Sequence, residues 1–274
     1  MTKAKPRLVW HLGASTDVGQ IRDINEDSYL AHPELIAVAD GVGGAAAGEV
    51  ASAIAIEQMR SLVTGKEVRG PSAEAFDDAV VAAREKIRSV VEDNPESEGM
   101  GTTLTALWLG EDEVTLAHIG DSRAYQLRGD DFVQVTVDDS YVQHLIDEGA
   151  ITKEEAIDHP YRSMVTRVLQ SKEAPTHFES RPARVGDRFV VCSDGLTDVV
   201  REETVEDVLR EFADPQAASE RLVELALRAG GPDNITVVVA DIKEATVDPK
   251  AVVFGSGFAL MLLAVGGFAW WAVG

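Results

Sequence analysis

Residues 35–44 read LIAVADGVGG, an apolar run that stops at an aspartate followed by glycines. Apolar runs of this length, bounded by Gly, Asp or Ser, are typical of β-strands. The other runs of this kind are residues 103–109, 113–119, 123–127, 188–192 and 235–240. Together they predict a domain rich in short strands.

Longer stretches between these runs predict helices. Residues 47–63 are rich in alanine, and residues 73–92 carry apolar side chains at the spacing of one helical face. A third helix is expected over residues 215–229, which begin with proline and are followed by two glycines. Because the helices fall in blocks between groups of strands, the pattern favours an α+β fold of antiparallel sheets flanked by helices.

The sequence also suggests boundaries along the chain. Residues 1–8 form a short extension, and the globular domain is expected over residues 9–240. Within it, residues 138–179 are polar and predict an inserted segment with short helical pieces, which we call the flap. Residues 241–250 are charged and predict a linker.

The charge of the chain excludes some partners. Its 25 Lys and Arg residues stand against 47 Asp and Glu residues, so the net charge is −22. Nucleic acids need clustered basic residues, and we therefore expect no nucleic-acid partner. A phosphorylated substrate would need local positive charge at its site, which bound cations and one or two arginines could supply.

The C-terminal region has a different character. Residues 251–273 contain no charged side chain, and this run of 23 is longer than the roughly 20 residues that cross a bilayer. Trp270 and Trp271 lie where aromatic residues collect at a membrane interface. We expect a single transmembrane helix; a buried core helix or hairpin is the alternative. Residues 1–12 contain no apolar stretch long enough for a signal peptide, and we therefore expect the domain to lie in the cytoplasm.

Acidic residues recur beside glycines, several of them at the ends of the expected strands. The five clusters are residues 22–27, 40–44, 120–123, 193–198 and 231–234. One Asp-Gly pair usually marks only a turn. Several carboxylates gathered at one place repel one another unless a cation lies between them, and hard cations such as Mg²⁺ or Mn²⁺ prefer oxygen ligands. The pattern makes a two-metal site plausible.

The motifs resemble those of the PP2C-type (PPM) metal-dependent protein phosphatases, in particular the bacterial members. The matching segments follow the order of the family, from about residue 9 to residue 240. They are 17–28 (DVGQIRDINEDS), 40–44 (DGVGG), 99–103 (GMGTT), 120–123 (GDSR), 193–198 (SDGLTD) and 231–236 (GPDNIT). The resemblance implies a four-layer α-β-β-α sandwich, in which two antiparallel sheets lie between layers of helices.

The resemblance also implies a site for two Mn²⁺ or Mg²⁺ ions. Asp40 would bridge both ions, and Gly41 would bind one through its carbonyl oxygen. Asp194 and Asp233 would complete the other, while Glu26 would act through bound water.

The remaining expected roles concern a third ion, the phosphate and the attacking water. Asp121 and Asp198 occupy the positions that hold a weaker third ion in bacterial members. Arg22 matches the arginine that binds phosphate, and Asp27 would orient the attacking water. Many eukaryotic members carry a histidine where this chain has Val42, so the leaving group must obtain its proton elsewhere.

The expected activity is hydrolysis of phosphoserine and phosphothreonine by a hydroxide that bridges the metals. Expected partners are phosphorylated proteins, in particular a serine/threonine kinase and its substrates. Two alternatives remain open: a catalytically silent phosphatase-like scaffold at the membrane, and a phosphatase of the same fold that acts on a small metabolite.

Overall fold

The computed structural model describes residues 7–43, 47–64, 72–170 and 174–245. Its first sheet has five antiparallel strands. In spatial order they are β1 (Leu8–Asp17), β12 (Ile235–Glu244), β11 (Arg188–Cys192), β7 (Arg123–Arg128) and β8 (Asp131–Gln134). The first and last long strands of the domain, β1 and β12, therefore lie side by side.

The second sheet has seven strands and is also antiparallel. Its order is β10 (His177–Pro182), β6 (Glu113–Ile119), β5 (Leu104–Leu109), β3 (Leu35–Val42), β4 (Gly101–Thr102) and β9 (Leu169–Gln170). The remaining strand, β2 (Asp27–Ala31), pairs with β3.

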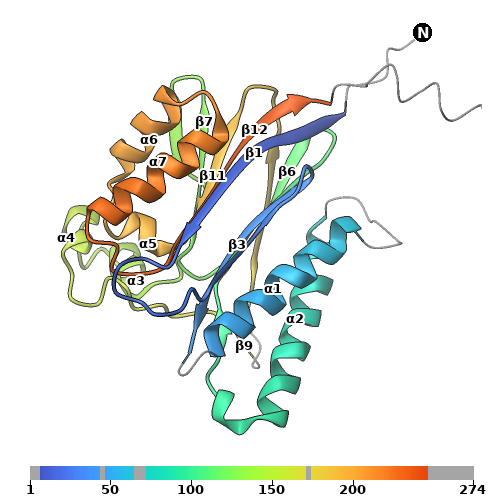
Figure 1. The fold of residues 1–274 in the computed structure, drawn as a ribbon, viewed down its shortest axis with the longest axis vertical. Coiled ribbons are helices and arrows are strands. Elements are labelled where there is room, and N and C mark those ends of the chain that lie inside the picture. The colour runs from blue at the N-terminus through green and yellow to red at the C-terminus, as the bar shows by residue number, and fades with distance from the viewer. Residues whose placement is uncertain (1–6, 44–46, 65–71, 171–173, 246–274) are drawn as a thin grey trace, which may run out of the picture. The chain divides into compact units, whose positions relative to one another are not determined.

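Helices cover the outer faces of both sheets (Figure 1). Helix α1 (Ala47–Thr64) packs on β3 and on α2 (Ala73–Asp93), whereas α7 (Pro215–Arg228) packs on β1, β12 and α6 (Glu202–Glu211). The shorter helices are α3 (Tyr141–Asp147), α4 (Lys153–Ile157), α5 (Asp194–Thr197) and one 3₁₀ turn (Pro95–Ser97). The expectation of two antiparallel sheets flanked by helices is confirmed.

The apolar run that begins at Leu35 shows why these layers form. Leu35, Ala37 and Ala39 belong to the core between the second sheet and its helices. Ile36 and Val38 belong instead to the core between the two sheets. A strand buried on both faces needs apolar residues at every position rather than at alternate ones. A third core fills the space between the first sheet and α6 and α7.

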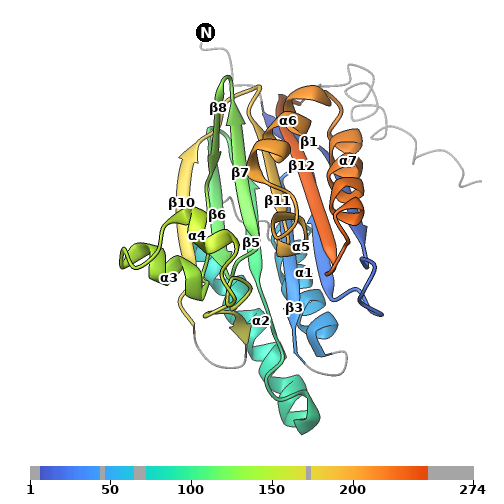
Figure 2. The same cartoon turned by 90° about the vertical axis from the view of Figure 1, so that its left-hand side faces the viewer.

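The flap leaves the first sheet after β8 and contains α3, α4 and β9. In Figure 2, α3 and α4 lie on the same side of the view as β10, and residues of α3 and β10 line one cavity.

The chain divides into two compact units, Met1–Glu244 and Ala245–Gly274. The transmembrane helix expected over residues 251–273 lies outside the described residues. None of the described helices is long and apolar enough to cross a membrane.

Candidate active site

The sheets bring several of the expected acidic residues to one end of the domain. Asp40 on β3 pairs directly with Asp27 at the start of β2. Asp194 follows β11, and Asp233 precedes β12, which is the neighbour of β11 in the first sheet. The strand ends thus place carboxylates from distant parts of the chain near one another, as the sequence pattern suggested.

This proximity shifts the pKa values of Asp40 and Asp194. Burial raises the pKa of Asp40 well above its usual range, and Asp27, Asp194 and Asp121 raise it further. Burial likewise raises the pKa of Asp194, with added contributions from Asp121 and Asp198. The negative charges of neighbouring carboxylates disfavour ionisation of Asp40 and Asp194, so the cluster has a strongly negative electrostatic potential.

Two buried carboxylate oxygens in this cluster have no hydrogen-bond partner among the described residues, namely Asp27 Oδ1 and Asp194 Oδ1. A buried anionic oxygen without a donor is costly unless a cation neutralises it. Burial is also the main reason that the pKa of Asp27 rises to about 6. The donor chemistry of the cluster therefore fits hard divalent cations.

The carboxylates do not form a closed coordination shell by themselves. Within the described ranges, no three acidic, histidine or cysteine side chains are arranged as a ready set of metal ligands. The fit to cations consequently rests on residue type, burial and mutual charge, and the structure shows no coordination geometry.

Arg22 lies at the rim of the cluster. Its guanidinium donates a hydrogen bond of 2.8 Å to Asp233 Oδ2, and its side chain is 48% exposed. That hydrogen bond is the main reason that the pKa of Arg22 is raised above its ordinary value. A charged guanidinium that reaches solvent beside a cation site is suited to bind two oxygens of a phosphate group.

Glu26 and Gly41 lie where the loop before β2 meets β3 and α1. The Gly41 amide donates to the carbonyl oxygen of Glu26 at 3.2 Å. A Cβ atom on Gly41 would lie 2.2 Å from the carbonyl oxygen of Gly48 in α1, so only glycine fits without a backbone shift. Burial raises the pKa of Glu26, whereas the Gly48 amide bound to its carboxylate acts in the opposite direction.

Asp121 and Asp198 lie on the flap side of the cluster. Burial, followed by the charge of Asp138, raises the pKa of Asp121 to about 7. Asp198 Oδ2 accepts a hydrogen bond of 2.8 Å from Ser163 Oγ and lies 3.9 Å from Arg162 Nε. Two consecutive flap residues thus contact one of the expected metal ligands.

Three polar residues that received no role from the sequence support the cluster. The Asp40 amide donates to Thr103 Oγ1 at 2.9 Å, and Ser193 Oγ donates to Asp27 Oδ2 at 2.7 Å. Asn234 Oδ1 accepts from the Glu26 amide at 2.8 Å. All three lie inside the motifs named above, and Ser193 and Asn234 directly adjoin acidic positions. Motif membership could have marked them as candidates, although it does not reveal which residues they contact.

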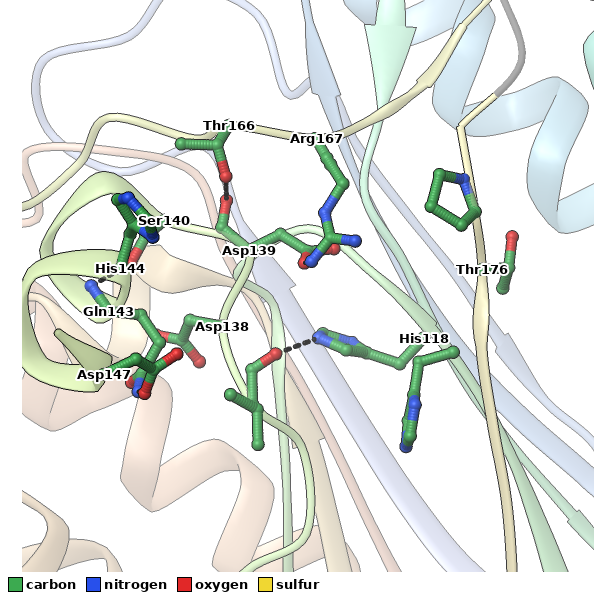
Figure 3. Close-up of a pocket in the computed structure, with 13 residues that line it drawn as sticks. His118, Asp138, Asp139, Ser140, Gln143, His144, Asp147, Thr166, Arg167 and Thr176 are labelled. Carbon is green, nitrogen blue, oxygen red and sulfur yellow. Dashed lines mark hydrogen bonds and ion pairs between the residues drawn. The ribbon is translucent and has the colours of Figure 1, made fainter.

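A cavity of about 640 Å³ is lined mainly by residues of the flap (Figure 3). Its wall includes His118, which is buried and bound through Nδ1 to Thr105 and through Nε2 to the Val137 carbonyl oxygen. With both ring nitrogens engaged, His118 is a core residue.

Comparison with known proteins agrees with this geometry. Residues 22–228 match the family model of protein phosphatase 2C. The chain is 47% identical over 239 residues to the serine/threonine protein phosphatase PstP of Mycobacterium tuberculosis, with 87% of this chain and 46% of that protein covered. The chain thus spans less than half the length of the mycobacterial protein.

Two further matches, one to another relative and one to the crystallised catalytic domain of PstP, cover almost the full length of the matched chain. Protein phosphatase PhpP of Streptococcus pneumoniae is 35% identical over 242 residues, which cover 84% of this chain and 96% of that protein. The crystal structure of the catalytic domain of PstP in complex with two manganese ions matches with a TM-score of 0.81 at 46% identity. That match covers 86% of this chain and 100% of the crystallised one.

Proposed function

The chain belongs to the protein phosphatase 2C family, and from this premise we propose that it is a metal-dependent phosphatase acting on phosphoserine and phosphothreonine in proteins. The observation that carries the proposal is the buried carboxylate cluster with Arg22 at its rim. Relatives with this fold are named serine/threonine protein phosphatases, and one of them holds two manganese ions.

We assign the ligands of two Mn²⁺ or Mg²⁺ ions to the cluster. Asp40 would bind both ions, the Gly41 carbonyl oxygen would bind one, and Asp194 and Asp233 would bind the other. Glu26 would act through water. When bound, such an ion pair activates water as a nucleophile and stabilises the charge of the phosphate.

Asp121 and Asp198 would hold a third and weaker ion at the flap side. Support for this assignment comes from the contribution of both residues to the raised pKa of Asp194. It also comes from the Ser163 hydroxyl, which approaches Asp198 and leaves its other carboxylate oxygen available.

The protein itself would position the substrate and the attacking water. Arg22 would hold two phosphate oxygens in its guanidinium fork, with Asp233 fixing the arginine from behind. Asp27 would orient the water, because Ser193 holds one of its oxygens and leaves Oδ1 without a donor. Since residue 42 is valine, the proton for the leaving serine oxygen would come from water.

The activity can be tested with full-length protein purified in detergent. Phosphothreonine peptides should be hydrolysed in the presence of Mn²⁺, whereas chelation or Asp194→Ala should reduce kcat by at least about 100-fold, the scale expected when a metal-centred catalytic group is lost. No hydrolysis over a range of Mn²⁺ and Mg²⁺ would favour the silent scaffold. Preference for a panel of phosphorylated metabolites would favour the alternative substrate class.

We further propose a single-pass membrane protein with its catalytic domain in the cytoplasm. The uncharged run over residues 251–273 supports the anchor, and the acidic character of the chain argues against attachment by charge alone. A serine/threonine kinase and its substrates would be the partners. Phosphoproteomes of cells that carry the wild type or Asp194→Ala would identify them.

A further inference from the structure

The flap begins with two consecutive aspartates that bind opposite ends of the turn carrying Asp121. Asp139 Oδ2 accepts a hydrogen bond of 3.0 Å from the Gly120 amide, and the Asp139 amide donates to the Gly120 carbonyl oxygen at 2.7 Å. The Asp138 carboxylate accepts three hydrogen bonds of 2.6–3.0 Å from Arg123. The turn of residues 120–123 is therefore held at its first and last residue by neighbouring residues of the flap.

Asp139 also connects the start of the flap to residues 166 and 167, further along the flap. Its carbonyl oxygen accepts hydrogen bonds from the Thr166 amide at 2.7 Å and from the Thr166 hydroxyl at 2.8 Å. Its carboxylate forms an ion pair with Arg167. Figure 3 shows Thr166 and Arg167 beside Asp139 at the wall of the cavity. Asp139 thus connects the start of the flap and residues 166–167 to the turn.

The same turn is attached to Asp40. Ser122 Oγ and Thr103 Oγ1 are 2.7 Å apart and share a hydrogen bond. Thr103 in turn receives the Asp40 amide at 2.9 Å. Since Asp121 lies between Gly120 and Ser122, these hydrogen bonds and the backbone of the turn together link the flap, through Asp121, to Asp40.

We propose that Asp138 and Asp139 are positioning residues that fix Asp121 for cation binding, and that Arg167 holds Asp139 in the orientation that reaches Gly120. This inference rests on the proposed function, in which Asp121 serves the third ion. Asp121 is 5% exposed, and the carboxylates of Asp138 and Asp198 repel its charged form. Asp138 and Asp139 would act instead by holding the turn that carries Asp121, because hydrogen bonds that orient a metal ligand commonly govern metal affinity.

A purely structural role for the same contacts makes a different prediction. The Asp139 side chain is only 9% exposed, so the loss of its charge would lower thermal stability in either case. Only a positioning role would also change the affinity for the weakest ion. Ion binding therefore separates the two roles, whereas stability does not.

The test is a Mn²⁺ titration of full-length protein in detergent, in which electron paramagnetic resonance measures the free ion. Asp139→Asn is compared with Asp147→Asn, the same chemical change at an exposed residue of α3 on the wall of the same cavity. Asp139→Asn should weaken the weakest Mn²⁺ binding step by about 10-fold or more, and the tighter steps should change much less. Asp147→Asn should bind Mn²⁺ like the wild type.

A wild-type Mn²⁺ isotherm for Asp139→Asn would overturn the proposal, whether or not the melting temperature falls. If Asp139→Asn does not fold, Arg167→Ala replaces it, because Arg167 is 50% exposed and the Gly120 contact remains possible. The weakest Mn²⁺ binding step of Arg167→Ala should also become weaker than in the wild type. An unchanged Mn²⁺ isotherm would again contradict the inference. Because no turnover is measured, failure here is distinguishable from absence of phosphatase activity.

Discussion

Gly41 and Gly13 both lie where a β-strand comes close to the backbone of a helix. A Cβ atom on Gly41 would lie 2.2 Å from the Gly48 carbonyl oxygen, and one on Gly13 would lie 2.2 Å from the Gln216 backbone. Gly41 is next to Asp40 in the carboxylate cluster. Gly13 lies in β1, four residues before the end of that strand that faces the cluster. The two glycines are thus under the same steric restriction, but only Gly41 adjoins a carboxylate of the cluster.

We therefore expect Gly41→Ala and Gly13→Ala to lower the free energy of unfolding similarly, by about 1–3 kcal/mol, because an added methyl group overpacks both sites. Only Gly41→Ala should also raise the Mn²⁺ concentration that gives half-maximal activity. Denaturant unfolding and Mn²⁺-dependent kinetics measure the two effects. Equal Mn²⁺ dependence in both variants would contradict the assignment of the Gly41 carbonyl oxygen as a ligand.

The acidic positions of the candidate site could be identified from the sequence, because several lie directly at the ends of apolar strands. The hydrogen bonds that hold these acidic residues could not be predicted, since the bonded residues are remote from one another in the chain. Asn234 binds the Glu26 amide across 208 positions, and Thr103 binds the Asp40 amide across 63. A polar residue carries no sign of such a partner until the sheets have formed.

At the level of elements, a strand is easiest to predict from the sequence when both of its faces are buried, because its residues are then apolar at successive positions. β3 is buried on both faces and is apolar at successive positions. β10 is an edge strand with exposed or half-buried residues throughout, and its sequence HFESRP lacks the apolar run by which strands were identified. The central strands of the sheets were thus predictable, while edge strands depend on pairing with a neighbour.

His118 on β6 should make the free energy of unfolding depend measurably on pH. Burial lowers its pKa below the ordinary value of 6.5, and this effect outweighs the hydrogen bond with the Val137 carbonyl oxygen and the charges of Asp139 and Asp138, which raise the pKa. The unfolded chain therefore binds a proton at His118 before the folded chain does. The contribution of neutral His118 to the free energy of unfolding is complete above about pH 6.5. It decreases as the pH falls, by at most about 1.4 kcal/mol per pH unit.

The raised pKa values of the buried carboxylates act in the opposite direction, so a difference measurement is needed. The free energy of unfolding of the wild type relative to His118→Gln should decrease between pH 7.5 and pH 5.5. Urea unfolding at several pH values measures this difference. A difference that stays constant over this range would show that His118 titrates alike in the folded and unfolded chain.

For the whole molecule, all residues assigned to catalysis lie within the unit that ends at Glu244. β12 begins beside Asp233 and ends at Glu244, so the chain leaves the domain at the opposite end of that strand from the cluster. The crystallised catalytic domain that matches this fold covers 86% of the present chain. Catalysis and the proposed membrane attachment should therefore be separable.

We expect a chain ended after residue 245 to retain kcat and KM for phosphothreonine peptides within about twofold, because distant and independent parts of a protein contribute additively. In cell fractionation the full-length protein should sediment with membranes, whereas the shortened chain should stay in the supernatant. Full-length protein that is soluble without detergent would contradict the anchor. Loss of activity in the shortened but folded chain would instead show that residues 246–274 contribute to the catalytic domain.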